Sequence, residues 1–167
     1  TIKQICARYH LKPDKNFGQN FLIDENVLRD IVSVAEIQKT ETIIEIGAGI
    51  GTLTSALARE AKQVYAFEVD PRLFPVLQET VPHKNVEIIK ENILQTRVGL
   101  QQIIARANGN YKIVANIPYS ITGILLRLFT ELVPQPKRVV VMVQKEVAER
   151  VTARAHATSR AEPGAAR

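Results

Sequence analysis

The segment Thr42-Ile-Ile-Glu-Ile-Gly-Ala-Gly-Ile-Gly51 decides how this chain folds. Its first five residues are mostly apolar and β-branched, which is typical of a buried strand. Three glycines at alternate positions follow directly, and from Thr52 the apolar residues Leu53 and Leu57 recur with helical spacing. A strand that passes through glycines into a helix is the first unit of a parallel sheet with crossover helices.

Further short apolar runs continue this alternation of strands and helices. The predicted strands lie at residues 64–67, 86–89, 112–115 and 139–143. Three helices are predicted from their first residues: one capped by Asp24, one that begins at Thr52, and one that begins at Asp70-Pro71 and is kinked or delayed by Pro75. Three more are predicted at residues 100–107, 122–132 and 145–151. Right-handed crossovers and almost wholly apolar strands predict an α/β fold, a parallel sheet with helices on both faces.

A polar residue or a glycine turn follows each of the first four predicted strands. Glu68 ends the second strand, Asn92 follows the third and Asn116 ends the fourth. In an open parallel sheet, ligands bind beyond the carboxyl ends of the strands, near the switch in strand order. We therefore expect these residues to converge on one crevice with the glycine turn.

The spacing Gly47-x-Gly49-x-Gly51 lets the backbone approach a ligand that a Cβ atom would repel. It differs from the Gly-x-Gly-x-x-Gly pattern that seats a pyrophosphate, and it suits a nucleoside without one, such as S-adenosylmethionine. Glu68 can accept from both hydroxyls of a ribose. A nicotinamide-dependent oxidoreductase would carry the same acid, and a tight turn beside a surface glutamate is the purely structural alternative.

The fourth strand ends abruptly at Asn116-Ile117-Pro118-Tyr119, because Pro118 has no N–H for the sheet and holds the preceding residue extended. The carboxamide oxygen of Asn116 and the carbonyl of Ile117 can accept both hydrogens of an exocyclic amine, while Tyr119 stacks on a planar base. The alternative is a strand closed by an Asn-Pro turn in which Tyr119 only packs.

Composition describes one globular domain. The 167 residues are 46% hydrophobic, enough to bury a core. No apolar run approaches the roughly 20 residues of a membrane span, and no signal peptide opens the chain. Cys6 is the single cysteine, and the three histidines lie far apart, so we expect no internal disulfide and no metal site. These features favour the reducing cytoplasm and no membrane partner.

The formal net charge of +5 arises at the two ends of the chain, since residues 21–144 carry as many basic as acidic residues. The excess basic residues are Lys3, Arg8, Lys12, Lys15, Lys145, Arg150, Arg154, Arg160 and Arg167. Basic ends on a neutral body favour a partner with a phosphate backbone, and ordinary solvated termini are the alternative.

Several motifs together carry a family resemblance. They are Phe17-Gly-Gln-Asn-Phe-Leu22, Glu45-Ile-Gly-Ala-Gly-Ile-Gly51, Glu68, Asn116-Ile-Pro-Tyr119 and Gln144-Lys-Glu-Val-Ala-Glu-Arg150. In order and spacing they resemble the ribosomal RNA adenine N6-dimethyltransferases of the KsgA type, over residues 15–152. The Erm methyltransferases share the Gln-Asn-Phe and Asn-Ile-Pro-Tyr elements, but the remaining segments resemble the housekeeping branch more closely.

The resemblance implies a Rossmann-like methyltransferase fold that binds S-adenosylmethionine. Asn20 and Leu22 would line the cofactor site, Gly47 would contact the amino-acid end, and Glu68 the ribose. Asn92 stands where the family usually has an aspartate that accepts from the adenine amino group of the cofactor. The catalytic motif would be Asn116, Ile117, Pro118 and Tyr119, with Asn116 holding the target amine and Tyr119 stacked on a flipped adenine.

Composition predicts a polar, basic segment at residues 1–16 that lies over the surface or frays, and a disordered tail without apolar periodicity at residues 153–167. The resemblance implies that residues 17–152 are an incomplete catalytic core. Family members continue past Arg150 with the last strands of the sheet and a helical RNA-binding domain, so we expect a C-terminally truncated chain. The expected partner is ribosomal RNA in the immature small subunit, bound by a monomer. The alternatives are a non-catalytic RNA-binding assembly factor and an Erm-type large-subunit enzyme.

Overall fold

The computed structural model describes residues 2–14, 19–117 and 119–153. The predicted disorder of residues 154–167 and the predictions for Phe17, Gly18 and Pro118 lie outside the described residues, as does the side chain of Tyr119.

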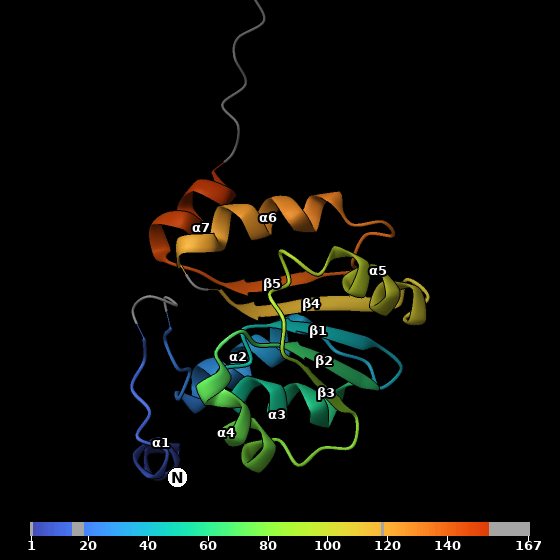
Figure 1. Ribbon diagram of the computed structural model, residues 1–167. Helices are drawn as coiled ribbons and strands as arrows, with labels where there is room; N and C mark the ends of the chain where they lie inside the picture. Colours follow the sequence, from blue (N-terminus) through green and yellow to red (C-terminus); the bar gives the residue numbers. More distant parts are fainter. Residues whose placement is uncertain (1, 15–18, 118, 154–167) are drawn as a thin grey trace, which may run out of the picture.

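Five parallel strands form a single sheet in the order β3-β2-β1-β4-β5 (Figure 1). The strands are β1 (Thr42–Ile46), β2 (Gln63–Phe67), β3 (Val86–Ile89), β4 (Tyr111–Asn116) and β5 (Val139–Met142). All four strand pairings are parallel, so the prediction of a parallel α/β sheet is confirmed. The strand order reverses between β1 and β4, which are hydrogen-bonded neighbours at the centre.

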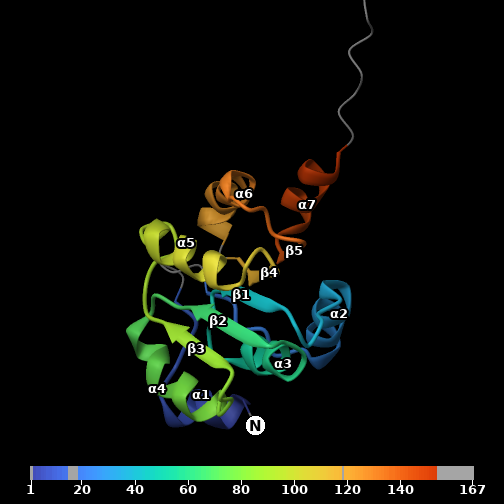
Figure 2. The ribbon, with the colours of Figure 1, turned by 90° about the vertical axis from the view of Figure 1, so that its right-hand side faces the viewer.

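Helices cover both faces of the sheet, as Figure 2 shows edge-on. One layer is α5 (Arg97–Arg106) and α6 (Thr122–Glu131), whose buried residues form one core with Ile44 and Ile46 of β1. The other layer is α2 (Glu25–Ala35), α3 (Thr52–Glu60) and α4 (Phe74–Thr80), which pack on Ile43 of the same strand. The last helix, α7 (Lys145–Thr152), buries no residue. None of the helices in the described ranges is long and apolar enough to cross a bilayer.

The N-terminal segment differs from its prediction. Residues 1–16 show little helical periodicity, yet the structure contains a short helix, α1 (Ile2–Arg8). Ile5 and Cys6 of this helix contact a small core of Leu73 and Val76, and Arg8 forms an ion pair of 2.7 Å with Glu79. Docking against α4 therefore stabilises a helix that is too short to form alone.

The region around Pro75 behaves as predicted. Asp70 caps a 3₁₀ turn, η2 (Pro71–Leu73), by accepting from the Arg72 backbone N–H, and the α-helix begins only at Phe74. A second 3₁₀ turn, η3 (Tyr119–Ile121), connects β4 to α6. Both turns lie at the carboxyl edge of the sheet, where they shape the loops beside the site.

A buried ion pair stabilises the opposite side of the sheet, at the amino ends of the central strands β1 and β4. Lys112 of β4 lies 2.8 Å from Glu41, just before β1, and both side chains are almost fully buried. The same ammonium group donates to the carbonyls of Ala35 and Glu36 at the end of α2. Its hydrogen bonds thereby help to satisfy the carbonyls of that helix terminus and fix α2 to the central strand pair.

Glu45 is a carboxyl group in the middle of β1 that is fully buried. Neither of its oxygens has a hydrogen-bond partner among the residues that the structure describes. Burial raises its pKa to about 8, the nearby Thr54 hydroxyl offsets part of this increase, and the charge of Glu68 adds to it. Glu45 is therefore mostly protonated at neutral pH, which avoids a buried charge directly beneath the glycine turn.

This proton makes stability depend on pH. The unfolded chain releases it near pH 4.5, whereas the native protein holds it to about pH 8. The stability contributed by protonated Glu45 is thus fully present below about pH 4.5 and is lost as the pH rises towards 8. We expect Glu45→Gln to raise the free energy of unfolding at pH 8 by on the order of 2–5 kcal/mol, with a much smaller change at pH 5.

Urea unfolding of both proteins at the two pH values measures this difference. Glu87→Gln on β3, where the side chain is exposed, is the control and should leave the pH dependence of stability as it is in the unmodified protein. Parallel pH profiles for the unmodified protein and Glu45→Gln would contradict the assignment.

Candidate functional site

The candidate site is a pocket at the carboxyl ends of the strands, where the segments that follow β1 and β4 diverge. The chain leaves β1 for α3 on one face and leaves β4 for α6 on the other, which opens a crevice between the two loops. The pocket is lined by residues 19–22, 46–50, 52, 53, 67–69, 91–93, 116, 117 and 121. As expected from the sequence, the polar ends of four strands meet in one place.

The glycine turn forms the floor of this pocket. All three of its glycines have positive φ angles, from 59° at Gly49 to 83° at Gly51, which side chains disfavour. A Cβ atom on Gly47 would lie 3.3 Å from the backbone oxygen of Asn116. The turn therefore needs glycine both for its backbone conformation and for the close approach of the two central strands.

Gly51 has a different environment from the other two glycines. It does not line the pocket, and a Cβ atom there would lie 2.4 Å from Val81 Cγ2 and 2.7 Å from Thr80 Oγ1. Thr80 also donates to the carbonyl of Ile50 at 2.8 Å. The packing of the turn against the end of α4 therefore leaves no room for a side chain at Gly51.

Glu68 lies at the side of the pocket and is buried. Its Oε2 accepts from the Gly49 backbone N–H at 2.8 Å, and its Oε1 accepts from the N–H groups of Val69 and Asp70 at 2.8 and 2.9 Å. Burial raises the pKa of Glu68, these three hydrogen bonds oppose the increase, and the Asp70 carboxylate adds to it. The group predicted to bind a ribose thus also ties the glycine turn to the end of β2.

Asn116 occupies the opposite wall, at the end of β4. Its Nδ2 donates to the carbonyl of Asn20 at 2.9 Å, which leaves Oδ1 as the acceptor end of the carboxamide. Ile117 follows in the pocket wall, with its backbone N–H directed to Met142 of β5 at 3.3 Å. Two of the four predicted catalytic residues, Asn116 and Ile117, are thereby placed in the pocket.

Asn92 also lines the pocket, after β3. Its Oδ1 accepts from the Leu94 backbone N–H at 3.0 Å, so the carboxamide begins the turn that follows the strand. The amide NH₂ is then the donor end of this side chain. The geometry therefore offers a donor as well as an acceptor where an aspartate would offer only acceptors.

A segment from the N-terminal part of the chain closes the pocket from the side. We call residues Gln19–Leu22 the strap. Thr52 Oγ1 donates to the Leu22 carbonyl at 2.7 Å, Asn116 donates to Asn20, and Gln19 Nε2 donates to Asp70 Oδ2 at 2.6 Å. Asn20 and Leu22, predicted as cofactor-binding residues, are thus held against the glycine turn.

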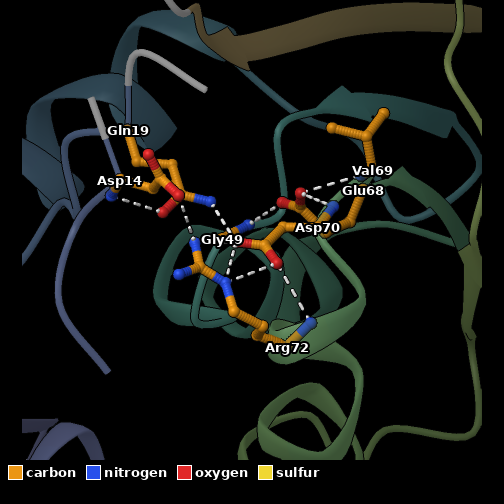
Figure 3. A network of polar contacts seen from close by, with 7 residues as sticks. All are labelled: Asp14, Gln19, Gly49, Glu68, Val69, Asp70 and Arg72. Atoms are coloured by element: carbon orange, nitrogen blue, oxygen red, sulfur yellow. Dashed lines mark hydrogen bonds and ion pairs between the residues drawn. The ribbon is translucent and has the colours of Figure 1, made fainter. Parts of the chain in front are cut away.

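The contact between Gln19 and Asp70 was not foreseen from the sequence. Figure 3 shows Asp70 between Gln19 and Arg72, beside the hydrogen bonds of Glu68. The sequence assigned Asp70 only to a helix cap and gave Gln19 no role of its own. No local signal connects two residues that lie 51 positions apart.

The arrangement suits an uncharged or cationic nucleoside better than a metal ion. Its polar side chains are the buried carboxylate of Glu68, a second carboxylate at Glu91, the Thr52 hydroxyl and the carboxamides of Gln19, Asn20, Asn92 and Asn116, and apolar side chains such as Phe21 and Ile46 line the remainder. Within the described ranges, no three His, Cys, Asp or Glu side chains lie close enough to hold a metal.

Comparison with known proteins gives one family. A family model described as ribosomal RNA adenine dimethylase matches residues 10–166. The chain is 45% identical over 155 residues to ribosomal RNA small subunit methyltransferase A of Clostridium botulinum (strain Okra / Type B1), which covers 92% of this chain and 55% of the relative. The chain spans about half the length of the curated relatives it matches.

Two solved structures of 28% sequence identity share the fold. A dimethyladenosine transferase from Plasmodium falciparum superposes with a TM-score of 0.69 over 81% of this chain and 47% of that protein. The 23S rRNA methyltransferase ErmE superposes with a TM-score of 0.64 over 78% of this chain and 50% of that protein. The Rossmann-like methyltransferase fold predicted from the sequence is confirmed.

The packing at Gly51 leads to a stability prediction. Gly51→Ala should lower the free energy of unfolding by about 1–3 kcal/mol, because the added Cβ meets α4 and the φ angle of 83° is strained. Gly123→Ala is the matched control, since a Cβ there has no neighbour within 4 Å and the residue lies in α6. The control should gain about 0.5–1 kcal/mol from helix propensity. Equal effects of the two changes in thermal and urea unfolding would contradict the packing argument.

Proposed function

The chain belongs to the ribosomal RNA adenine dimethylase family, and from this premise we propose that it carries the catalytic site of an S-adenosylmethionine-dependent enzyme that dimethylates N6 of adenines in small-subunit ribosomal RNA. The observation that carries the proposal is the Asn116 carboxamide. It lies in the same pocket as the glycine turn and Glu68, with its NH₂ held by Asn20 and its oxygen left as an acceptor. An exocyclic amine needs acceptors at this position.

The residues present fit the cofactor. Gly47 and Gly49 line the pocket without side chains, so a ligand can approach their backbone closely. Glu68 is the acid beside the ribose position. A carboxylate has about four acceptor sites, and three backbone N–H groups occupy all but about one, so that Oε2 keeps a site for one ribose hydroxyl. Asn92 and Ile93 would lie along the adenine. When bound, the cofactor supplies an electrophilic methyl group on a sulfonium.

The mechanism derives from how this chain holds the amine. The lone pair of an adenine amine is delocalised into the ring, which makes it a poor nucleophile. Asn116 Oδ1 and the Ile117 carbonyl accept its two hydrogens and favour a pyramidal nitrogen, whose lone pair is then available for attack. With a sulfonium methyl group in line, the amine held by Asn116 and Ile117 would take up the methyl group, the thioether would be the leaving group and the nitrogen proton would pass to water. No strong base is needed, so most of the acceleration is positional.

Ribosomal RNA of the small subunit is the proposed substrate. The relative named above is a small-subunit methyltransferase at 45% identity, whereas ErmE, named for 23S rRNA, is 28% identical. The target adenine would be unstacked from a loop or helix end, stacked on Tyr119 and held by shape and phosphate contacts. We propose a monomer that acts in the cytoplasm and turns over twice per base.

Transfer of a tritiated methyl group from S-adenosylmethionine to immature small ribosomal subunits tests the proposal, with mature small subunits and large subunits as parallel substrates. Label in the immature small subunit, recovered as N6-dimethyladenosine, supports it. Label only in the large subunit would favour the Erm-type alternative. Binding of cofactor and RNA without transfer would favour a non-catalytic assembly factor.

Asn116→Ala should lower the rate of methyl transfer by at least about 10²-fold, because it removes an acceptor that positions the amine. S-adenosylhomocysteine should bind nearly as well as before, since the cofactor contacts lie on the glycine turn and Glu68. Asn26→Ala, an exposed residue of α2, is the matched control and should retain activity. Calorimetry that showed lost cofactor binding in Asn116→Ala would assign Asn116 to the cofactor instead.

A further inference from the structure

We propose that Asp70 is a positioning residue that fixes the strap through Gln19 and thereby sets which end of the Asn116 carboxamide faces the target amine. The effect on catalysis rests on the proposed methyl transfer, whereas the orientation of the Asn116 carboxamide can be tested without it. Asp70 is outside the pocket lining, and its influence passes through Gln19 and Asn20 to Asn116.

Asp70 is a buried carboxylate that is saturated with donors. Arg72 donates through Nε at 2.9 and 3.1 Å and through NH2 at 2.6 Å, and its backbone N–H adds a bond of 3.0 Å. These bonds lower the pKa of Asp70, burial opposes them, and the Gln19 amide lowers it further. Asp70 is therefore ionised at neutral pH and can only accept. Figure 3 shows its contacts with Gln19 and Arg72.

This carboxylate fixes the orientation of Gln19. Because Asp70 accepts, the atom 2.6 Å from its Oδ2 must be the Nε2 donor of Gln19. The other end of the same carboxamide, Oε1, accepts from the Asp14 backbone N–H at 3.0 Å, and the Gln19 N–H returns to the Asp14 carbonyl at 3.1 Å. Arg72 also reaches the Asp14 side chain at 3.3 Å. The N-terminal side of the strap is thus fastened by a charged network.

The next residue transmits this attachment to the catalytic motif. Asn20 follows Gln19 directly, and its carbonyl accepts from Asn116 Nδ2 at 2.9 Å. A carboxamide can sit in two orientations related by a half turn, and only the one with Nδ2 towards Asn20 presents Oδ1 as the acceptor. If the strap moves away, the donor end of Asn116 can face the amine, where two donors would oppose each other. The strap therefore sets the orientation of the Asn116 carboxamide, with Oδ1 facing the target amine.

Gln19→Glu makes the contact between residues 19 and 70 depend on pH. At pH 8 a second carboxylate would face Asp70 at hydrogen-bond distance, with Glu68 and Asp14 as further negative neighbours and Arg72 as the one cation in the network. Repulsion should then release the strap. On acidification the pair can share a proton, which restores a hydrogen bond between residues 19 and 70.

The side-chain NH₂ resonances of Asn116, identified by their loss in Asn116→Asp, report its orientation without any ligand. In Gln19→Glu we expect them to move towards the position of a solvent-exposed amide at pH 8 and to return at pH 5.5. Methyl transfer at pH 8 should fall about tenfold or more, in line with the loss of a hydrogen bond to a charged group. Gln102→Glu, on the exposed side of α5, is the matched control and should leave both readouts unchanged.

Gln19→Leu removes the donor to Asp70 at every pH and adds no charge. It should move the Asn116 resonances towards the position of a solvent-exposed amide at both pH 8 and pH 5.5, whereas those of Gln19→Glu should return at pH 5.5. Unchanged Asn116 resonances in Gln19→Glu at pH 8 would overturn the proposal, and so would Asn116 resonances of folded Gln19→Leu at the positions of the unmodified protein. Absence of methyl transfer in the unmodified chain would overturn the proposed function but leave the resonance test intact.

Discussion

The parallel pairing of β1 with β4 is the constraint on which the rest of the structure depends. Register between these strands runs from Thr42 opposite Tyr111 to Ile46 opposite Ala115, so that Gly47 and Asn116 come next on adjacent strands. The approach is close enough that a Cβ atom on Gly47 would lie 3.3 Å from the Asn116 carbonyl. The turn proposed to bind the cofactor and the residue proposed to bind the amine are thereby adjacent at the switch point, without either loop having to reach across the sheet.

Three carboxyl groups lie within and around this turn, and each is accommodated by a different physical means. Glu45 has no hydrogen-bond partner among the described residues and is mostly protonated at neutral pH, because burial makes its charged form costly. Glu68 is held by three backbone N–H groups, one of them from the turn itself. Asp70 is neutralised by Arg72. The lowered pKa of Asp70 and the raised pKa of Glu45 together place negative charge beside the strap rather than under the turn.

The site combines segments that are remote along the chain. The strap belongs to the N-terminal segment, the turn and Glu68 to the first half of the sheet, and Asn116 to the fourth strand. The pairing of β1 with β4 brings the turn to Asn116, and hydrogen bonds across long sequence separations, such as the one between Asn20 and Asn116, add the strap to the same pocket. The chain spans about half the length of its curated relatives, and the proposed cofactor pocket and Asn116 both lie within this half.

The sequence by itself determined the fold class and the chemistry at the strand ends. Apolar runs buried on both faces, glycines at alternate positions and polar residues after each strand are local signals, because period and backbone freedom are properties of a few neighbouring residues. Only the tertiary structure decided the order of the strands, the helix α1 that exists by docking against α4, and the network from Arg72 through Asp70 and Gln19 to the strap. Gln19 and Asp70 are 51 positions apart, and what joins them is the packing of the N-terminal segment against the edge of the sheet. Such a contact leaves no periodic trace in the sequence, since it depends on where two surfaces meet rather than on how either segment is patterned.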